Sequence, residues 1–296
     1  MVQGMGALDG RVVVVTGAGR GLGRAHAQLA AAEGAKVVVD DVGAAPDGSG
    51  TDPSLAQAVA DEIVAAGGEA VAVSHDVRTM AGAEALLQTA LDTYGAVHGL
   101  VNNAGVLRDR MFVNMSEAEW DDVITGQLKA TFAPARIFAA HWRDQAKAGW
   151  DGKPAMVNVS STSGLIGQAG QTNYGAAKAG IASLSIILAG EVERYGIRVN
   201  AIVPVARTRM TEDLPGVKEM VAVPADPNAF DTYNPANVSP VVVWLLTSDC
   251  PFTGRTFYAK GGEIREFLPW QYGRILDNNG ARWTVAALDK EMRTLD

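Results

Sequence analysis

Short runs of β-branched residues alternate with longer helical stretches along most of this 296-residue chain. Seven strands are predicted, at 11–17, 36–41, 70–77, 98–105, 155–161, 197–204 and 255–262, with helices between them. A capping-box pattern at Ser116 and Glu119 begins a long predicted helix that runs to about Ala148. Continuous apolar strands separated by helices are typical of a parallel sheet covered on both faces. Because crossover connections are right-handed, we predict an α/β fold with a doubly wound parallel sheet, the Rossmann fold.

The first predicted strand runs into a glycine-rich turn, TGAGRGLG, from Thr16 to Gly23. Glycines let the backbone approach a pyrophosphate closely, and the N-terminus of the next helix adds unpaired N–H groups and a positive dipole end. A glycine triplet alone is weak evidence, but its place between a strand and a helix is the context that dinucleotide binding requires. We therefore predict cofactor contacts from Gly17, Arg20, Gly21, Leu22 and Gly23.

An acidic residue follows this turn by about twenty residues, at the end of the second predicted strand. Asp41, with Asp40 as the alternative, is placed to accept hydrogen bonds from the adenosine ribose hydroxyls. Its charge would repel a 2′-phosphate, and no basic residue follows it. Arg20 could attract a phosphate, but on balance the sequence favours NAD over NADP as the cofactor.

Polar residues also end the third and fourth predicted strands. In a doubly wound sheet, ligands bind in the crevice outside the carboxyl ends of the strands. We expect the third strand to present its last residues to an adenine and the fourth to present the motif NNAG to the cofactor. The residues concerned are Asp76 and Val77, then Asn102, Asn103, Ala104 and Gly105.

The stretch QTNYGAAKAG places Tyr174 four residues before Lys178, on one face of a predicted helix. The strand before it brings Ser161 to the same edge of the sheet. A tyrosine of pKa about 10 is a poor base, but a nearby ammonium and an oxidised nicotinamide favour the phenolate. The phenolate can then take a proton from an alcohol as hydride leaves. On spacing alone the pair is weak evidence, because the small residues around it also suit a closely packed helix.

In combination, TGAGRGLG, NNAG, the serine and YGAAK resemble the short-chain dehydrogenase/reductase family over residues 9–262. The resemblance implies that Tyr174 is the general acid/base, that Lys178 lowers its pKa and holds the nicotinamide ribose, and that Ser161 orients the substrate oxygen. It further implies that Asn102 supports the cofactor side and that Thr208 lies near the carboxamide. Gln127 stands where the family usually has an asparagine of the proton relay, and its side chain is one methylene longer.

The motifs LVNNAGVLRDRMF, GQTNYGAAKAG and VSPVVVWLL are similar to those of a subgroup of this family. The subgroup comprises the (3R)-hydroxyacyl-CoA dehydrogenase unit of multifunctional enzyme type 2 and related bacterial hydroxysteroid and hydroxyacyl-CoA dehydrogenases. It implies NAD(H)-dependent interconversion of a secondary alcohol and a ketone, on a 3-hydroxyacyl-CoA or a steroid. One alternative is a 3-oxoacyl-[acyl-carrier-protein] reductase, which normally uses NADPH and against which Asp41 argues. Another is a non-catalytic dinucleotide-binding sensor or scaffold, which predicts loss of the serine, tyrosine or lysine, and all three are present.

No composition break divides the chain, so one domain is predicted. It has a catalytic part over 1–262, with a flap over about 207–235, and a C-terminal extension over 263–296. The net charge of −8 argues against nucleic acid or an anionic membrane as a partner. The N-terminal valine run is too short for a signal peptide or membrane span, which predicts a cytoplasmic protein. The single cysteine has no metal-ligand spacing around it, so no metal is expected, and the resemblance implies a homodimer or homotetramer.

Overall fold

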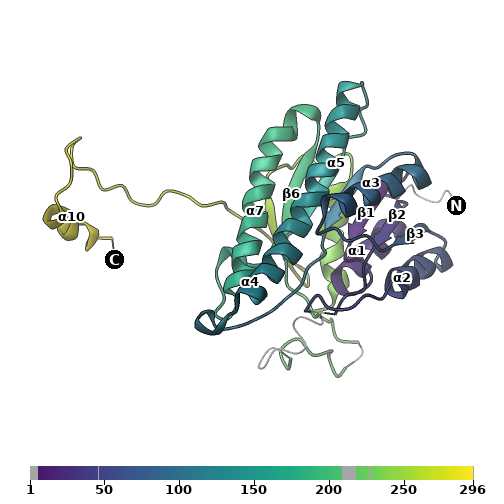
Figure 1. Cartoon of the computed structure of the whole chain (residues 1–296), viewed down its shortest axis with the longest axis horizontal. Helices are drawn as coiled ribbons and strands as arrows, with labels where there is room; N and C mark the ends of the chain where they lie inside the picture. The colour runs from purple at the N-terminus through teal and green to yellow at the C-terminus, as the bar shows by residue number, and fades with distance from the viewer. Residues whose placement is uncertain (1–5, 46, 209–217, 227, 296) are drawn as a thin grey trace. The chain divides into compact units, whose positions relative to one another are not determined.

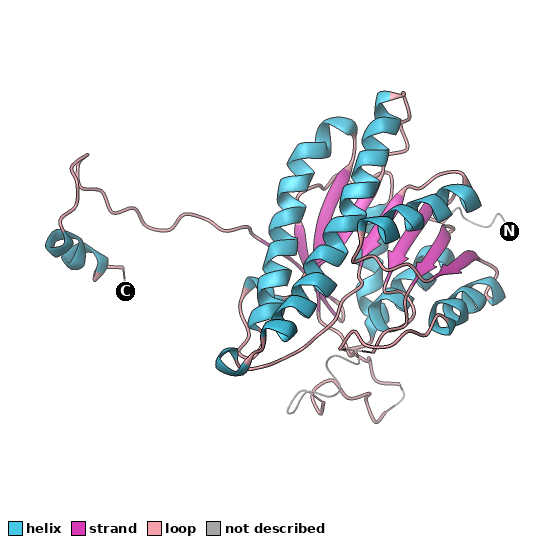
Figure 2. Cartoon of the chain, in the orientation of Figure 1, coloured by secondary structure: helices cyan, strands magenta, loops and turns pink. Residues whose placement is uncertain are grey.

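A computed structural model of the chain describes residues 6–45, 47–208, 218–226 and 228–295. The chain forms two compact units, Met1–Glu266 and Phe267–Asp296. The larger unit contains a sheet between two layers of helices (Figures 1 and 2). The predicted flap is described only in part, because residues 209–217 and 227 lie outside the described residues.

The sheet has eight strands in the order β3-β2-β1-β4-β5-β6-β7-β8. Each pair from β3 to β7 is parallel, and the two-residue connection from β7 to β8 is of a length that joins only antiparallel strands. All seven predicted strands are present, and β8 was not predicted. The strands are β1 (Val12–Thr16), β2 (Lys36–Asp40), β3 (Glu69–Val73), β4 (Gly99–Asn102), β5 (Ala155–Val159), β6 (Arg198–Pro204), β7 (Thr256–Lys260) and β8 (Glu263–Phe267).

The third strand is shorter than predicted, so the expectation that Asp76 and Val77 end it was wrong. β3 pairs with β2 only, and the last pair of that ladder is Asp40 with Val73. Beyond it the backbone N–H of His75 donates to the Asp40 carboxylate at 2.8 Å instead of continuing the ladder. Asp76 and Val77 therefore lie in the loop that follows the strand.

The strands are apolar on both faces because helices cover both. In β1, Val13 and Val15 pack in the same apolar cluster as residues of α1, α2 and α9, whereas Val14 packs with residues of α3, α5 and α7. This alternation follows from the period of two along a strand. The helices are α1 (Gly21–Ala32), α2 (Ser54–Ala65), α3 (Met80–Tyr94), α5 (Ala130–Lys147), α7 (Thr172–Val192) and α9 (Ser239–Leu246).

The long helix predicted from Ser116 is interrupted. It begins as α4 (Glu117–Val123), at the predicted capping box between Ser116 and Glu119. A π-helical segment, Ile124–Lys129, then precedes α5. Such segments insert an extra residue into a turn and are frequent at functional sites. The segment carries Gln127, and the apolar periodicity of the sequence gives no sign of it.

The helix α7 carries the Tyr174–Lys178 pair and lies across the sheet. With its extension to Tyr195 it is long and apolar enough to cross a membrane, judged by length and composition alone. Its contacts include β5 and β6 of the sheet and the π-helical segment, and Ile181 and Ser185 are fully buried. Packing against the sheet therefore accounts for the apolar residues on its buried face, whereas Ile186 and Ile187 are exposed.

The smaller unit contains the helix α10 (Val285–Met292). The hydroxyl of Thr284 caps this helix by accepting a hydrogen bond from the backbone N–H of Ala287 at 3.2 Å. Arg274 donates to the carbonyl of Thr294 at 2.5 Å. The unit begins four residues later than the predicted extension at 263, because β8 lies beside β7.

Candidate active site

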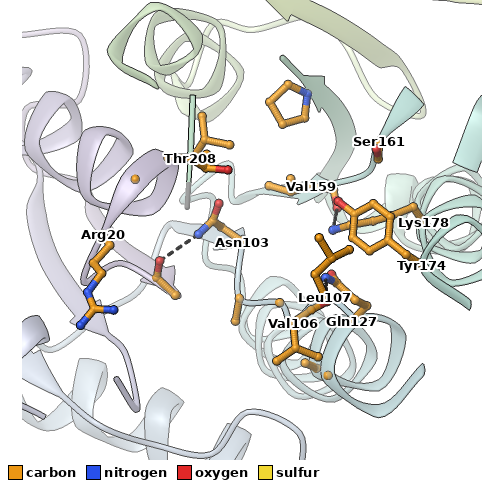
Figure 3. A pocket seen from close by; sticks show the side chains of 18 of the residues that line it. Arg20, Asn103, Val106, Leu107, Gln127, Val159, Ser161, Tyr174, Lys178 and Thr208 are labelled. Carbon is orange, nitrogen blue, oxygen red and sulfur yellow. Dashed lines mark hydrogen bonds between the residues drawn. The ribbon is translucent and has the colours of Figure 1, made fainter. Parts of the chain in front are cut away.

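A cleft of about 430 Å³ opens at the carboxyl ends of the strands, where the strand order reverses between β1 and β4 (Figure 3). Ligands bind at this place in doubly wound sheets. All the predicted site residues line the cleft except Gly23 and Asn102. Those that line it are Gly17, Arg20, Gly21, Leu22, Asp41, Asp76, Val77, Asn103, Ala104, Gly105, Gln127, Ser161, Tyr174, Lys178 and Thr208.

Gly23 and Asn102 support the cleft from behind. A Cβ at Gly23 would lie 2.2 Å from the carbonyl oxygen of Gly17, so only glycine allows the helix to approach the turn so closely. Asn102 is 2% exposed, and its Nδ2 donates to Oδ1 of Asn158 at 2.8 Å. The Nδ2 of Asn158 in turn donates to Oγ of Ser185 at 2.9 Å. These amides connect β4, β5 and α7 within the protein core.

The glycine turn is held against β4 by Asn103. Its Nδ2 donates to the carbonyls of Thr16 at 3.1 Å and Gly17 at 2.9 Å. Gly17 has φ +62°, and a Cβ there would lie 2.7 Å from Cα of Ala104. The glycines therefore leave no side chain over the backbone at the start of α1. A bound pyrophosphate requires this access to the backbone N–H groups. The residues present fit a dinucleotide.

Two adjacent carboxyl groups lie at one end of the cleft, and they differ in environment. The two oxygens of Asp41 accept from the backbone N–H groups of Gly19 and Gly43, each at 2.7 Å. Each oxygen keeps a further lone pair for a ligand hydroxyl. Asp40 is 1% exposed, and burial raises the pKa of its carboxyl well above the usual range. Asp41 is therefore the better placed of the two for a ribose.

Ser161, Tyr174 and Lys178 lie on the opposite side of the cleft from Arg20 (Figure 3). Lys178 is 4% exposed, and its Nζ donates to the carbonyl of Val159 at 2.7 Å. The same nitrogen lies 5.5 Å from the centre of the Tyr174 ring. Ser161 is the N-cap of the short helix α6 (Thr162–Leu165).

Burial controls the protonation of both members of the pair. It raises the pKa of Tyr174 to about 12; a hydrogen bond with Ser161 opposes this rise and the charge of Asp109 adds to it. Burial also lowers the pKa of Lys178 to about 7. Desolvation is the main cause of both shifts, because it penalises the charged form of each group.

Gln127 reaches the cleft from the π-helical segment, beside Leu107 (Figure 3). Its Nε2 donates to the carbonyl of Val106 at 2.6 Å. Its Oε1 is buried and has no hydrogen-bond partner among the described residues. A Cβ at Gly105 would lie 2.5 Å from the amide nitrogen, so the glycine of NNAG makes room for the longer side chain. The amide is anchored at its nitrogen and keeps its oxygen available as an acceptor.

The described part of the predicted flap contributes to the cleft. Met220 and Val221 line it, and Arg207 donates to the carbonyl of Val221 at 2.8 Å. Thr208 lies close to the glycine turn. A Cβ added at Gly21 would be 3.8 Å from the Cγ2 of Thr208.

Sequence reasoning missed Ser163 and Gln171, which also line the cleft. Their hydroxyl and amide groups are joined by a hydrogen bond of 2.6 Å. The only available signal was the place of Gln171, three residues before Tyr174 at the start of the same helix. The contact of Lys178 with the Val159 carbonyl was also missed, because a backbone acceptor leaves no mark in the sequence.

Comparisons with known proteins agree with this geometry. The family model for the short chain dehydrogenase matches residues 11–216. Hydroxyacyl-CoA dehydrogenase ChsB1 of Mycobacterium tuberculosis is 40% identical over 289 residues, which cover 97% of this chain and 88% of that protein. The peroxisomal multifunctional enzyme type 2 of Mus musculus is 41% identical over 263 residues, covering 89% of this chain and 33% of the enzyme. A crystal structure of a short chain dehydrogenase from Mycobacterium avium has a TM-score of 0.86 and 48% identity, covering 98% of this chain and 95% of that one.

Proposed function

We propose that this chain, which belongs to the short-chain dehydrogenase/reductase family, is an NAD-dependent dehydrogenase of 3-hydroxyacyl-CoA thioesters. The family is one of oxidoreductases that act on CH–OH groups, and family and fold imply a nicotinamide dinucleotide. The observation that carries the proposal is the presence of Ser161, Tyr174 and Lys178 in one cleft with the glycine turn and Asp41.

NAD is supported by the carboxylate at the cofactor end of the cleft. Asp41 would accept hydrogen bonds from the ribose hydroxyls, and its charge would repel the 2′-phosphate of NADP. Its position is fixed by the N–H groups of Gly19 and Gly43. Gly17 and Gly21 would expose backbone N–H groups to the pyrophosphate.

The chemistry would be carried by the residues on the other side of the cleft. When bound, the oxidised nicotinamide accepts the hydride, and its positive charge favours the phenolate of Tyr174. The Tyr174 oxygen would take the alcohol proton in oxidation and return it in reduction. The Ser161 hydroxyl would donate a hydrogen bond to the same substrate oxygen.

Lys178 would stabilise the phenolate and bind the cofactor ribose. One of its N–H groups is used by the Val159 carbonyl, and among the described residues the others remain for these two tasks. Gln127 would continue the proton relay through its Oε1, which has no partner among the described residues.

The substrate class is supported by the relatives whose printed names are hydroxyacyl-CoA dehydrogenase and multifunctional enzyme type 2. A direct test is NADH formation with 3-hydroxyacyl-CoA thioesters of varied chain length, with hydroxysteroids as a parallel series. Turnover of the thioesters with NAD is expected, and Tyr174→Phe should remove it. Turnover of steroids alone would overturn the substrate class. A preference for NADPH and 3-oxoacyl-[acyl-carrier-protein] would favour the reductase alternative.

A further inference from the structure

A chain of hydrogen bonds connects the loop after β4 to the start of α7. Gln171 is 8% exposed, and its Nε2 donates to Oδ2 of Asp109 at 2.8 Å. Its Oε1 accepts from the hydroxyl of Ser163 at 2.6 Å. The Gln171 amide is thereby fixed in one orientation, and the Ser163 hydrogen is committed to it.

The same chain continues to the proposed catalytic pair. The backbone N–H of Ser163 donates to Oγ of Ser161 at 3.2 Å. The Ser161 hydroxyl lies close enough to the Tyr174 phenol to lower its pKa. Asp109 is therefore connected through Gln171 and Ser163 to the serine beside the phenol.

The backbone holds this arrangement in register. The N–H of Arg110 donates to the carbonyl of Gly170 at 2.8 Å, and Arg110 forms an isolated parallel bridge with Gln171. The Nδ2 of Asn173 donates to the carbonyl of Arg108 at 3.0 Å. These contacts flank Asp109 on one segment and precede Tyr174 on the other.

The carboxylate of Asp109 does not form an ion pair with the arginine on either side of it in the sequence. Its Oδ1 is buried and has no hydrogen-bond partner among the described residues. The two arginines beside it are engaged elsewhere: Arg108 pairs with Asp122 at 3.1 Å, and Arg110 with Glu119 at 3.0 Å. A buried carboxylate oxygen without a partner is costly, which is why such a group calls for a functional explanation.

We propose that Asp109 is a positioning residue for the Ser161–Tyr174 pair. Through Gln171 it holds Ser163, whose backbone N–H donates to the Ser161 hydroxyl, and the negative charge of its carboxylate acts on the phenol. The inference rests on the proposed function, in which Tyr174 is the proton acceptor.

The charge of Asp109 acts on Tyr174 in a definite direction. Burial is the largest cause of the raised pKa of the phenol, and the charge of Asp109 raises it further. The remaining titratable groups that line the cleft are Lys178 on the same helix, Tyr233, and, in the cofactor half, Arg20, Asp40, Asp41, His75, Asp76 and Arg78. Replacing the carboxylate by an amide keeps an acceptor for Gln171 and removes the charge. The phenol should then release its proton at lower pH.

The test is the pH profile of kcat/KM for alcohol oxidation in Asp109→Asn and Gln171→Leu. The first variant should move the acidic limb of the profile to lower pH by about half to one unit. The second should lower kcat by roughly 10-fold to 100-fold without changing the KM for NAD, because it removes the hydrogen bonds that tie Asp109 and the Ser163 hydroxyl to the start of α7. Asp121→Asn is the matched control: it removes the same charge from an exposed position of α4 and should leave the profile unchanged.

An acidic limb that does not move in Asp109→Asn would overturn the proposal, whether kcat is unchanged or falls together with thermal stability. A titration of phenolate absorbance gives a readout that needs no substrate. With the spectrum of Tyr174→Phe subtracted, the Asp109→Asn variant should ionise at lower pH than the wild type. If no alcohol is oxidised by the wild type, the proposed function fails, and this titration still decides on Asp109.

Discussion

The ammonium nitrogen of Lys178 lies 5.5 Å from the centre of the Tyr174 ring and donates to the main-chain carbonyl of Val159 at 2.7 Å. One turn of α7 separates the two side chains, and the acceptor belongs to the last residue of β5. The position of the pair thus depends on how closely the helix packs on that strand. The small residues of QTNYGAAKAG allow such packing, and this packing positions Tyr174 and Lys178 in the cleft.

Replacing Tyr174 by phenylalanine should abolish dehydrogenation. The change removes only the hydroxyl, so the ring packing and the cleft remain. We expect a loss of at least 100-fold in kcat, because the proton acceptor is gone. Calorimetric titration should show unchanged NAD binding. Substantial residual oxidation would show that another group accepts the proton.

Replacing Asp41 by alanine should narrow the preference for NAD over NADP. The variant loses the acceptor for the ribose hydroxyls and the charge that repels a 2′-phosphate. The measurement is the ratio of kcat/KM for the two coenzymes. Asp40→Asn serves as the comparison, because this buried neighbour accepts from His75 and should leave the ratio unchanged. If only the Asp40 variant altered the ratio, Asp40 would be the ribose ligand.

Gln127→Ala should change the pH profile of kcat. It removes the carbonyl oxygen that we assign to the proton relay and leaves the Val106 carbonyl without its donor. Gln127→Asn restores the amide at a shorter reach and should recover part of the rate. A Gln127→Ala profile that matches the wild type would exclude the side chain from the relay.

The protein should lose stability in mild acid because of His26. This side chain is 1% exposed between α1 and α9, where its Nδ1 bonds Oγ of Ser239 at 2.9 Å. Burial lowers its pKa from 6.5 to about 3. Between these values the unfolded chain takes up a proton that the folded chain does not, so the free energy of unfolding falls as the pH falls through this window.

For His26 alone, the decrease between pH 7 and pH 5 is about 2 kcal/mol. Urea titrations at the two pH values should show this difference in the wild type and a smaller one in His26→Gln. Ser239→Ala is the control that keeps the imidazole and should keep the pH dependence. An equal pH dependence in His26→Gln would assign the acid sensitivity to other groups.

The sequence predicted the sheet and most of the cleft because these depend on local patterns. Buried valine runs, the glycine turn and the motif NNAG are each continuous in the chain. The end of β3 was misplaced, because it is set by where β2 stops pairing with it, at Asp40 and Val73. The π-helical segment was missed, because one extra residue in a turn barely alters the apolar spacing around Gln127.

The link from Asp109 to Gln171 lay beyond sequence reasoning for a different reason. The two residues are 62 positions apart, and their contact arises only when the loop after β4 meets the start of α7. Each residue alone is an ordinary polar residue in a loop or at a helix end. Only their contact in the folded chain assigns them a role in positioning.

The buried amides of Asn102 and Asn158 have a consequence for how the chain selects its fold. Their side chains form a chain of hydrogen bonds with the Ser185 hydroxyl between β4, β5 and α7. Sliding β5 by one residue would turn Asn158 to the other face of the sheet and leave its neighbours unsatisfied in an apolar core. Apolar strands alone can pair in several registers. The buried amides disfavour a shifted register, because it would break their hydrogen bonds. The alignment of strand and helix, and with it the depth of the tyrosine in the cleft, is thus encoded by residues that never contact a substrate.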